Sequence, residues 1–385
     1  MRIAIQASDL DHERIDGTRV YLRELLKRFG ELSPETLFSL YHKGEFNQEL
    51  APPKRENYQE EQRPFPWAWM QTRFALELFL KRPEKLFLPI QAAPVFLPRS
   101  LQVTATIHDL AFKRFPETFP RRDLWKLNFM LETAVKRADK LIAVSESTKR
   151  DLLEFFPKLP EDRVKVIHHG FDDEFFGMKI PEEELAVKLR SYNLKAQSYV
   201  LYVGALQPRK NLVRLIQAFE IMKTRVPEAK LVLAGEEAWL AESIIDVWEA
   251  TPSRDDIVLT GRVSFPNLRT LYQGARVFAF PSLYEGFGLP ILEAFASGVP
   301  VLTADNSSLR EVAGEAALYC QADDVADMAG KLEHLWQDET LRADLVTKGQ
   351  ERLKQFSWDQ CARETLDYIL HSPSQSIIFE TTAQR

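Results

Sequence analysis

The sequence is poor in cysteine and has no long apolar run. Its 385 residues include 2 cysteines, Cys320 and Cys361, which are too few and too scattered for a disulfide framework or a zinc site. We therefore expect a reducing, intracellular setting. No apolar run approaches the roughly 18 residues that a membrane-spanning helix needs, and the opening MRIAIQASDLDHER lacks the pattern of a signal peptide. These absences predict a soluble or peripheral protein.

The sequence also lacks the strong positive charge of nucleic-acid-binding proteins. Its formal net charge is −6, which argues against a nucleic-acid partner. Residues 1–180 hold 29 Lys and Arg against 27 Asp and Glu, while the remainder holds 21 against 29. The basic pairs of the first part, such as Lys81-Arg82 and Arg121-Arg122, are explained by solvated helix faces. The alternative is a surface for an anionic partner, such as a phospholipid leaflet or a phosphorylated acceptor.

Short apolar runs alternate with longer amphipathic runs along the whole chain. The predicted strands lie at residues 2–7, 37–42, 85–89, 103–109, 140–145, 164–169, 199–206, 229–236, 257–261, 277–282, 299–304 and 317–320. Helical patterns lie between many of them, as at residues 20–29, 123–138, 211–225, 267–275 and 290–298. Unbroken apolar strands that alternate with helices predict parallel sheets covered on both faces.

Two such series predict an α/β protein of two doubly wound domains that face each other across a cleft. We place an N-terminal Rossmann-like domain at residues 1–180 and a C-terminal one at 181–355, followed by a C-terminal segment at 356–385 that ends in a tail. The interruption at 44–66 is charged and rich in proline, and we predict a long loop there.

The segment VGALQPRKN follows a predicted strand and opens a predicted helix. Gly204 permits a tight turn, and Arg209 and Lys210 lie at the helix start, where free amides and the helix dipole attract anions. Surface decoration is the alternative, but ligands of doubly wound sheets bind beyond the carboxyl ends of strands. We therefore predict a diphosphate clamp. The segment is neither a Walker loop nor a GxGxxG fingerprint.

The segment PSLYEGFGLPILEAFASG holds two glutamates, Glu285 and Glu293. One continuous helix would place them about 12 Å apart along its axis, but two glycines and an interior Pro290 oppose such a helix. Pro290 suits a first helical turn instead. We therefore predict a loop over residues 284–289 and a helix over 290–297, with Glu293 in its first turn.

The predicted helix start forms a cradle for an anion or a sugar, with a carboxylate on each side. Its amides belong to Phe287, Gly288 and Leu289. Carboxylates accept hydrogen bonds from sugar and ribose hydroxyls, and cations with fixed amides stabilise the charge that builds on a departing nucleoside diphosphate. A carboxylate also helps an oxocarbenium-like sugar. The alternative for Glu293 is a favourable interaction with the helix dipole, about 0.3–1 kcal/mol.

The glutamate pair of FPSLYEGFGLPILEAFASG resembles the E-x7-E signature of retaining glycosyltransferases of family four, which have the GT-B architecture. VGALQPRKNL, GVPVLTADNSSLREVAGEAALY, VSESTKRDLLEFF, VIHHGFDDEFF and FSWDQCARETL are similar to further segments of that family. The resemblance covers nearly the whole chain and is weakest at residues 44–100. HDLAFKRFPETFP is similar to a segment of bacterial mannosyltransferases of surface-polysaccharide assembly.

The resemblance implies a role for each matching residue of the second domain. The donor diphosphate would bind Arg209, Lys210 and Gly204, the ribose would bind Glu293, and the transferred sugar would contact Glu285, while Phe287, Gly288 and Leu289 supply amides to sugar and phosphate. Arg262 and Val263 would lie near the nucleobase. A helix within residues 356–385 would return to the first domain.

In the first domain the resemblance singles out four residues. His108 would lie near the donor sugar and the acceptor and would be catalytic together with Glu285; a purely structural histidine is the alternative. Asp109 would orient the ring of His108 or cap a turn. Gly17 and Thr18, before a helix predicted at 19–29, match the loop that approaches the reacting centre, although DGTRVY stands where the family has a glycine-rich GIGRY-like run.

The implied reaction moves a sugar of mannose or glucose type from a nucleotide-diphosphate sugar to a saccharide or lipid-linked acceptor, with an α-linkage. In the front-face mechanism usual for the class, the leaving phosphate helps to deprotonate the acceptor, and neither metal nor cofactor is expected. Asp9-Leu10-Asp11 spells the DxD metal motif of another transferase architecture, but it lies in a run of charge and we expect no metal there.

The resemblance favours GDP-mannose as the donor, with UDP-glucose second, and a cytoplasmic protein with peripheral contact at the inner face of the membrane. Two alternatives stay open on the same architecture, a non-catalytic nucleotide-sugar-binding protein and a sugar-nucleotide epimerase. A phosphorylase would need a longer chain and the setting of a pyridoxal-phosphate lysine.

Overall fold

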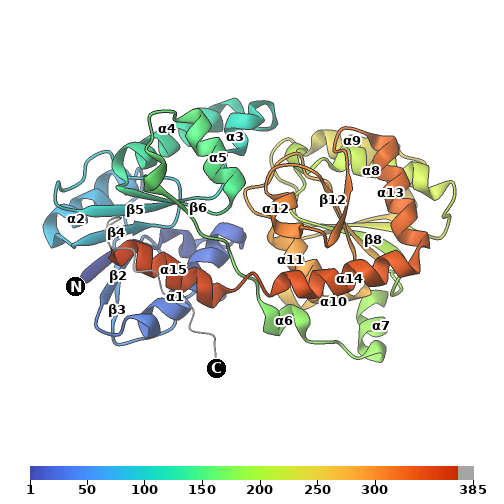
Figure 1. The fold of residues 1–385 in the computed structure, drawn as a ribbon, viewed down its shortest axis with the longest axis horizontal. Helices are drawn as coiled ribbons and strands as arrows, with labels where there is room; N and C mark the ends of the chain where they lie inside the picture. Colours follow the sequence, from blue (N-terminus) through green and yellow to red (C-terminus); the bar gives the residue numbers. More distant parts are fainter. Residues whose placement is uncertain (372–385) are drawn as a thin grey trace, which may run out of the picture.

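The computed structural model describes residues 1–371, which form two parallel sheets with helices on both faces (Figure 1). The seven described strands of the first sheet run in the order β3-β2-β1-β4-β5-β6-β7. They are β1 (Arg2–Gln6), β2 (Leu37–His42), β3 (Tyr58–Gln62), β4 (Lys85–Leu88), β5 (Gln102–Ile107), β6 (Lys140–Ala143) and β7 (Val164–Val166). The helices among them are α1 (Gly17–Leu32), α2 (Ala75–Lys81), α3 (Ala111–Arg114), α4 (Arg121–Arg137) and α5 (Glu146–Phe155).

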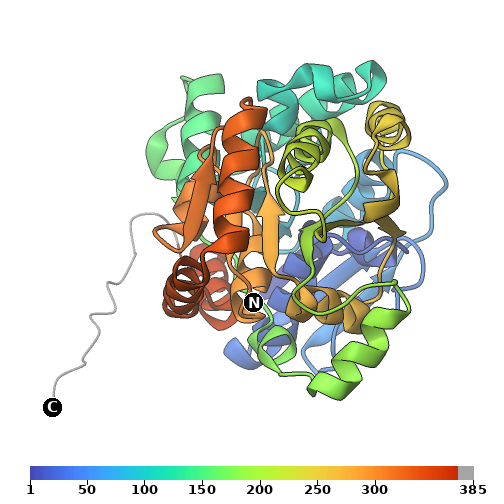
Figure 2. The ribbon, with the colours of Figure 1, turned by 90° about the vertical axis from the view of Figure 1, so that its right-hand side faces the viewer.

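The six described strands of the second sheet run in the order β10-β9-β8-β11-β12-β13. They are β8 (Tyr199–Val203), β9 (Lys230–Ala234), β10 (Ile257–Gly261), β11 (Val277–Phe280), β12 (Val301–Ala304) and β13 (Ala317–Cys320). Its helices are α8 (Leu212–Lys223), α9 (Glu242–Ala250), α10 (Phe265–Gly274), α11 (Leu289–Ala296), α12 (Leu309–Ala313), α13 (Val325–Gln337) and α14 (Glu339–Leu353). Figure 2, which views the molecule from this side, shows the strands flanked by helices.

All strand pairs in both sheets are parallel. The predicted α/β class with two doubly wound sheets is therefore confirmed. Most of the strands are largely apolar and buried, because both faces of each sheet are covered. Leu78 of α2, Leu131 of α4 and Leu152 of α5 belong to the core on one face of the first sheet, and Leu25 of α1 belongs to the core on the other.

The prediction of one long loop over residues 44–66 is wrong, because β3 lies within it. This strand pairs with β2 at the edge of the first sheet, and its sequence YQEEQ is largely exposed or half-exposed. Glu61 is buried and pairs with Arg63, and Tyr58 donates its hydroxyl hydrogen to the carbonyl of Leu26 and accepts from the amide of Gly30. An edge strand that faces water needs no apolar run, so it left no hydrophobic pattern.

Two short helices and a returning helix connect the two halves. Residues 172–198 hold α6 (Asp173–Gly177) and α7 (Glu182–Arg190) and no strand. The last described helix, α15 (Trp358–Leu370), packs beside α1 of the first half (Figure 1), where the rings of Trp358 and Tyr21 lie 6.3 Å apart.

The domain boundaries at residues 180 and 355 stay a prediction, and the predicted tail lies outside the described residues. No helix within 1–371 is long and apolar enough to cross a membrane.

The two halves make direct polar contacts beside the cleft. Tyr284, after β11, donates its hydroxyl hydrogen to Asp151 of α5 at 2.6 Å. Glu311 of α12 accepts from the amide of Glu146 at the start of α5 at 2.8 Å, and lies 2.7 Å from Nε2 of His168. These contacts hold α5 of the first half against the loop after β11 and against α12 of the second half.

Candidate active site

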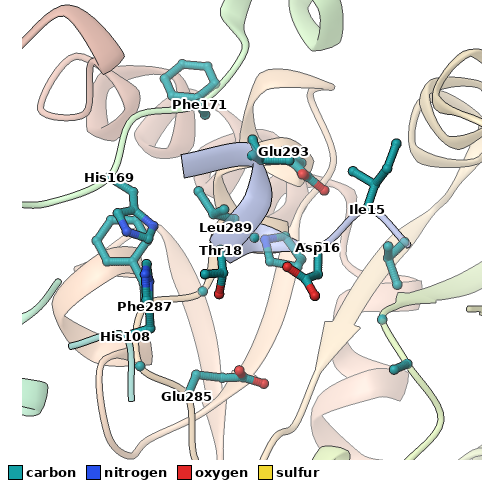
Figure 3. Close-up of a pocket in the computed structure, with 18 of the residues that line it drawn as sticks. Ile15, Asp16, Thr18, His108, His169, Phe171, Glu285, Phe287, Leu289 and Glu293 are labelled. Carbon is teal, nitrogen blue, oxygen red and sulfur yellow. The ribbon is translucent and has the colours of Figure 1, made fainter. Parts of the chain in front are cut away.

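A cleft of about 450 Å³ lies between the carboxyl ends of the two sets of strands (Figure 3). Its volume falls in the range of small-molecule sites, about 300–1,000 Å³. Twelve of the candidate site residues line it: Gly17, Thr18, His108, Asp109, Gly204, Arg209, Lys210, Glu285, Phe287, Gly288, Leu289 and Glu293. The other two, Arg262 and Val263, line an adjoining cavity of about 460 Å³ that shares Gly204 with the cleft. The structure thus brings the predicted residues together, while their roles stay a prediction.

Three charged side chains form a buried cluster in the cleft wall. Glu285 lies 3.0 Å from Nη1 of Arg209 through one carboxylate oxygen and 2.5 Å from Nζ of Lys210 through the other. Their side chains are only about a tenth exposed. The cluster carries a formal charge of +1, because one carboxylate faces two cations. The sequence predicts separate roles for the two cations and for Glu285. In the structure the three side chains interact directly.

Burial and pairing with cations have opposite effects on the pKa of Glu285. Burial raises the pKa of its carboxyl, but Lys210 and Arg209 outweigh burial and lower the pKa from 4.5 to about 2. Burial lowers the pKa of Lys210, and Glu285 opposes that change. The carboxylate therefore stays charged at neutral pH, and it stabilises both cations where water cannot.

Arg209 and Lys210 do not open a helix, contrary to the prediction. They lie in a 3-10 turn at Pro208–Lys210, and α8 begins only at Leu212. Asn211 separates the two elements at φ 62°, and its side-chain amide donates to the carbonyls of Pro281 and Ala322 at 3.1 and 2.6 Å. The amide of Asn211 thus joins this turn to the loop after β11 and aims the two cations at Glu285.

The loop that carries Glu285 lies against the first domain. The carbonyl of Gly286 accepts hydrogen bonds from Ser145 Oγ at 2.7 Å and Thr148 Oγ1 at 3.2 Å. A Cβ atom on Gly286 would lie 1.8 Å from the carbonyl oxygen of His108, so only glycine permits this approach. The close approach brings Glu285 and His108 to one side of the cleft.

The turn from this loop into α11 follows the predicted break closely. Gly288 is the N-cap at φ 117°, and Pro290 lies in the first turn. No backbone carbonyl of the described residues accepts from the amides of Phe287 and Gly288. These amides are therefore available as donors at the cleft. Since α11 begins at Leu289, Glu293 is its fifth residue rather than part of its first turn, which weakens the helix-dipole explanation.

Glu293 is partly buried, and among residues 1–371 its carboxylate has one hydrogen-bond partner, which is neutral. The hydroxyl of Tyr272 on α10 donates to its carboxylate at 2.8 Å. Burial raises the pKa of Glu293 to about 7, with the Tyr272 hydrogen bond acting against this rise and Asp172 adding to it. A carboxyl group whose pKa is raised to about 7 by burial is typical of functional sites.

His108 follows β5 and is fixed by backbone groups. Its Nε2 lies 2.7 Å from the carbonyl oxygen of Pro89, and its amide donates to Gln91 Oε1 at 3.0 Å. The contact to a carbonyl means that Nε2 carries the hydrogen, so Nδ1 is an acceptor in the neutral ring. Burial lowers the pKa of His108, which favours that neutral form.

Gly17 and Thr18 begin α1 rather than preceding it, which corrects the predicted helix start at residue 19. The N-cap is Asp16, whose carboxylate accepts from the amide of Arg19 and pairs with its guanidinium. An N-cap aspartate satisfies free amides of the first turn. The sequence analysis did not single out Asp16, although it lines the cleft between Thr18 and Ile15 (Figure 3).

Arg262 lies at the rim of the adjoining cavity. Its guanidinium donates to the carbonyl of Glu13 at 2.8 Å, across the two domains, and lies 3.8 Å from Glu236. Both side chains are about half exposed. The lining of this cavity therefore includes two arginines, Arg14 and Arg262, and two glutamates, Glu49 and Glu236.

In the Asp9-Leu10-Asp11 motif, Asp11 has a structural role. Asp11 accepts from the amides of Lys43 and Gly44 at 2.8 and 2.7 Å, so it anchors the loop after β2. Within residues 1–371, no cluster of three metal-binding side chains occurs.

The sequence analysis missed two buried side chains at the site. Tyr272 is the partner of Glu293, and His169 lies in the cleft wall above His108 (Figure 3). The histidine doublet after β7 in VIHHGFDDEFF was a usable signal for His169. Tyr272 left no signal, because it sits in an ordinary amphipathic helix.

The two doubly wound domains that face each other across the cleft have the arrangement of the GT-B architecture. Residues 15–175 match the family described as Glycosyltransferase Family 4, and residues 188–352 match Glycosyl transferases group 1. The chain belongs to glycosyltransferase family 4, in its group 1. It is a retaining hexosyltransferase that uses a nucleotide-diphosphate sugar.

Individual relatives agree with this assignment. The chain is 33% identical over 275 residues to O-antigen chain mannosyltransferase B of Escherichia coli, which covers 71% of each chain. It is 26% identical over 310 residues to O-antigen chain mannosyltransferase RfbU of Salmonella typhimurium, which covers 80% of each.

Solved structures support the fold independently. WaaG, a glycosyltransferase involved in lipopolysaccharide biosynthesis, superimposes with a TM-score of 0.72 at 13% identity and covers 97% of this chain and 100% of its own. Anabaena HepE in complex with UDP and glucose gives 0.73 at 16%, with 95% and 98% covered. The predicted GT-B architecture is confirmed.

Proposed function

We propose that this glycosyltransferase transfers mannose from GDP-mannose to a saccharide or lipid-linked saccharide acceptor, forming an α-linkage. The observation that carries the proposal is the buried cluster of Glu285, Arg209 and Lys210, with a charge of +1, facing a cleft of ligand size. Two similar curated proteins are named as O-antigen chain mannosyltransferases, which favours mannose and a surface-polysaccharide acceptor. A cytoplasmic site of action with peripheral membrane contact belongs to the same proposal.

In this proposal Arg209 and Lys210 bind the diphosphate and stabilise the charge that builds on it as the sugar departs. Glu293 accepts hydrogen bonds from the ribose hydroxyls. Glu285, held in place by the two cations, accepts from a sugar hydroxyl and stabilises the electron-poor sugar. The leaving phosphate takes the proton of the acceptor hydroxyl, so the reaction needs no protein base and no metal.

His108 has a positioning and electrostatic role in the same proposal. Its Nε2–H is engaged by Pro89, and the carbonyl of His108 lies against Gly286. The ring therefore presents an acceptor to a sugar hydroxyl, at a distance set by the loop that carries Glu285.

The proposal is tested by a thermal-shift panel of GDP, UDP, GDP-mannose and UDP-glucose. A ligand at 100 times its Kd stabilises the protein by about 2.7 kcal/mol. We expect GDP and GDP-mannose to raise Tm more than their uridine counterparts do. A larger shift with UDP would contradict the GDP assignment, and no shift with any nucleotide would contradict the nucleotide-binding role of the cleft.

A further inference from the structure

His169 is a buried polar side chain without a protein partner. Its residue is 4% exposed, and neither ring nitrogen has a hydrogen-bond partner among residues 1–371. Buried polar groups are nearly always paired, because an unpaired one loses its bonds to water without compensation. A conflict of this kind between burial and pairing is expected at functional sites.

The ring of His169 is held rigidly by packing. It stacks on Tyr21 with ring centroids 4.8 Å apart, and the rings of Trp358 and Phe287 lie 5.5 and 5.0 Å away. These three neighbours come from α1, α15 and the loop that carries Glu285. These rings pack around the imidazole, and both nitrogens are buried without a hydrogen-bond partner among residues 1–371.

His169 lies in the part of the cleft that also holds His108. It lines the cleft on the same wall as His108 and Phe287 (Figure 3), and the two histidine rings lie 5.6 Å apart. Behind this wall, His169 also lines a cavity of about 70 Å³ whose walls include Ser357 and Glu364. A polar cavity of this volume is large enough for water.

The protonation state of the His169 ring indicates which kind of ligand it can bind. Burial, with contributions from His108 and His168, holds the pKa of His169 well below 6.5, so the ring is neutral. A neutral imidazole has one donor and one acceptor. Phosphate oxygens would engage only the donor, whereas a hydroxyl group both donates and accepts. The neutral ring therefore matches a sugar hydroxyl better than it matches the diphosphate.

We propose that His169 binds a hydroxyl group of the transferred sugar and thereby helps to select that sugar. The inference rests on the proposed function, since the sugar is that of the donor. It assigns to the loop after β7 a direct contact with substrate. His108, Glu285 and His169 then surround the sugar from three separate elements.

The test uses His169→Phe, which keeps an aromatic ring in the stack and removes both nitrogens. We expect kcat/KM for GDP-mannose to fall about tenfold to a hundredfold, as for one lost substrate hydrogen bond in a buried site. The affinity for GDP, which lacks the sugar, should stay unchanged. Tm should stay equal or rise, because the variant no longer buries two unpaired polar atoms.

Tyr21→Phe is the matched control. It removes a hydroxyl from the neighbouring ring of the same stack, where that hydroxyl contacts Thr106 at 3.1 Å, and it should leave kcat/KM nearly unchanged. His169→Asn and His169→Gln place an amide near the positions of Nδ1 and Nε2 respectively. We expect one of these two variants to recover part of the activity that His169→Phe loses.

Deoxy analogues of GDP-mannose identify the hydroxyl. At the position that His169 binds, removal of the hydroxyl should slow the wild type but not His169→Phe, so the two losses should not add. Full activity of His169→Phe, equal loss of GDP affinity, a clear fall in its Tm, or additive losses at every sugar position would overturn the inference. A wild type that turns over no nucleotide sugar would instead refute the proposed function.

Discussion

Glu285→Gln tests the buried cluster directly. The substitution keeps the size of the side chain and removes its charge, which leaves Arg209 and Lys210 buried without a neutralising carboxylate. Breaking a buried ion pair by removing one partner costs about 3–5 kcal/mol. The two cations lower the pKa of Glu285 to about 2, so the charged carboxylate stabilises the folded protein. We therefore expect the variant to unfold several degrees below the wild type.

The same variant should respond more strongly to nucleotide. In the wild type Glu285 already neutralises part of the charge of Arg209 and Lys210, whereas in Glu285→Gln the diphosphate would be their main anionic partner. We expect GDP to raise the Tm of the variant by more degrees than it raises that of the wild type, although sugar transfer is lost. Differential scanning fluorimetry with and without GDP measures both effects.

Glu315→Gln is the control, because Glu315 is an exposed carboxylate of the same domain. It should change neither Tm nor the GDP response. The stability that Glu285 contributes should be complete above its unfolded pKa and lost as pH falls from about 4.5 to about 2. A Glu285→Gln variant that is as stable as the wild type at pH 7, with a smaller GDP response, would refute the account of the cluster.

Three further predictions concern the rest of the site. Because burial raises the pKa of Glu293 to about 7, the folded protein keeps a proton that the unfolded chain releases, so stability should fall as pH rises from about 4.5 to 7. Urea unfolding across that range should show that Glu293→Gln removes this slope. At pH 8 the same variant should bind GDP at least tenfold more weakly in calorimetry, since ribose hydroxyls lose a charged acceptor. His108→Ala should lower kcat more than it raises the Kd for GDP, in steady-state kinetics against calorimetry; the opposite split would contradict its place near the sugar.

The fold was largely predictable because most of its strands are buried on both faces. Apolar runs such as YVLYV in β8 and VFAF in β11 mark parallel strands without ambiguity. β3 was not predictable, since an edge strand with a polar sequence has no such pattern. The helix start at Pro290 followed from backbone chemistry, because glycine and proline limit the local conformations.

The site was predictable as a set of residues but not as an electrostatic arrangement. The sequence places Glu285 and Arg209 after different strands, and only the folded chain shows that they pair. The same holds for Glu293, whose neutral partner Tyr272 is distant in sequence. Among the described residues His169 has no hydrogen-bond partner, and its ring packs against Tyr21 and Trp358. These two residues are far apart in the sequence, so no local pattern encodes the arrangement.

The central claim is retaining transfer of mannose from GDP-mannose, and donor turnover followed by proton NMR tests it most directly. With water as the acceptor, purified protein should release mannose slowly from GDP-mannose and not from UDP-glucose. The first-formed sugar should be the α-anomer, detected before mutarotation, and Glu285→Gln should release none. First formation of the β-anomer would contradict retention, turnover of UDP-glucose alone would contradict the donor, and the absence of any turnover would favour a non-catalytic binding protein.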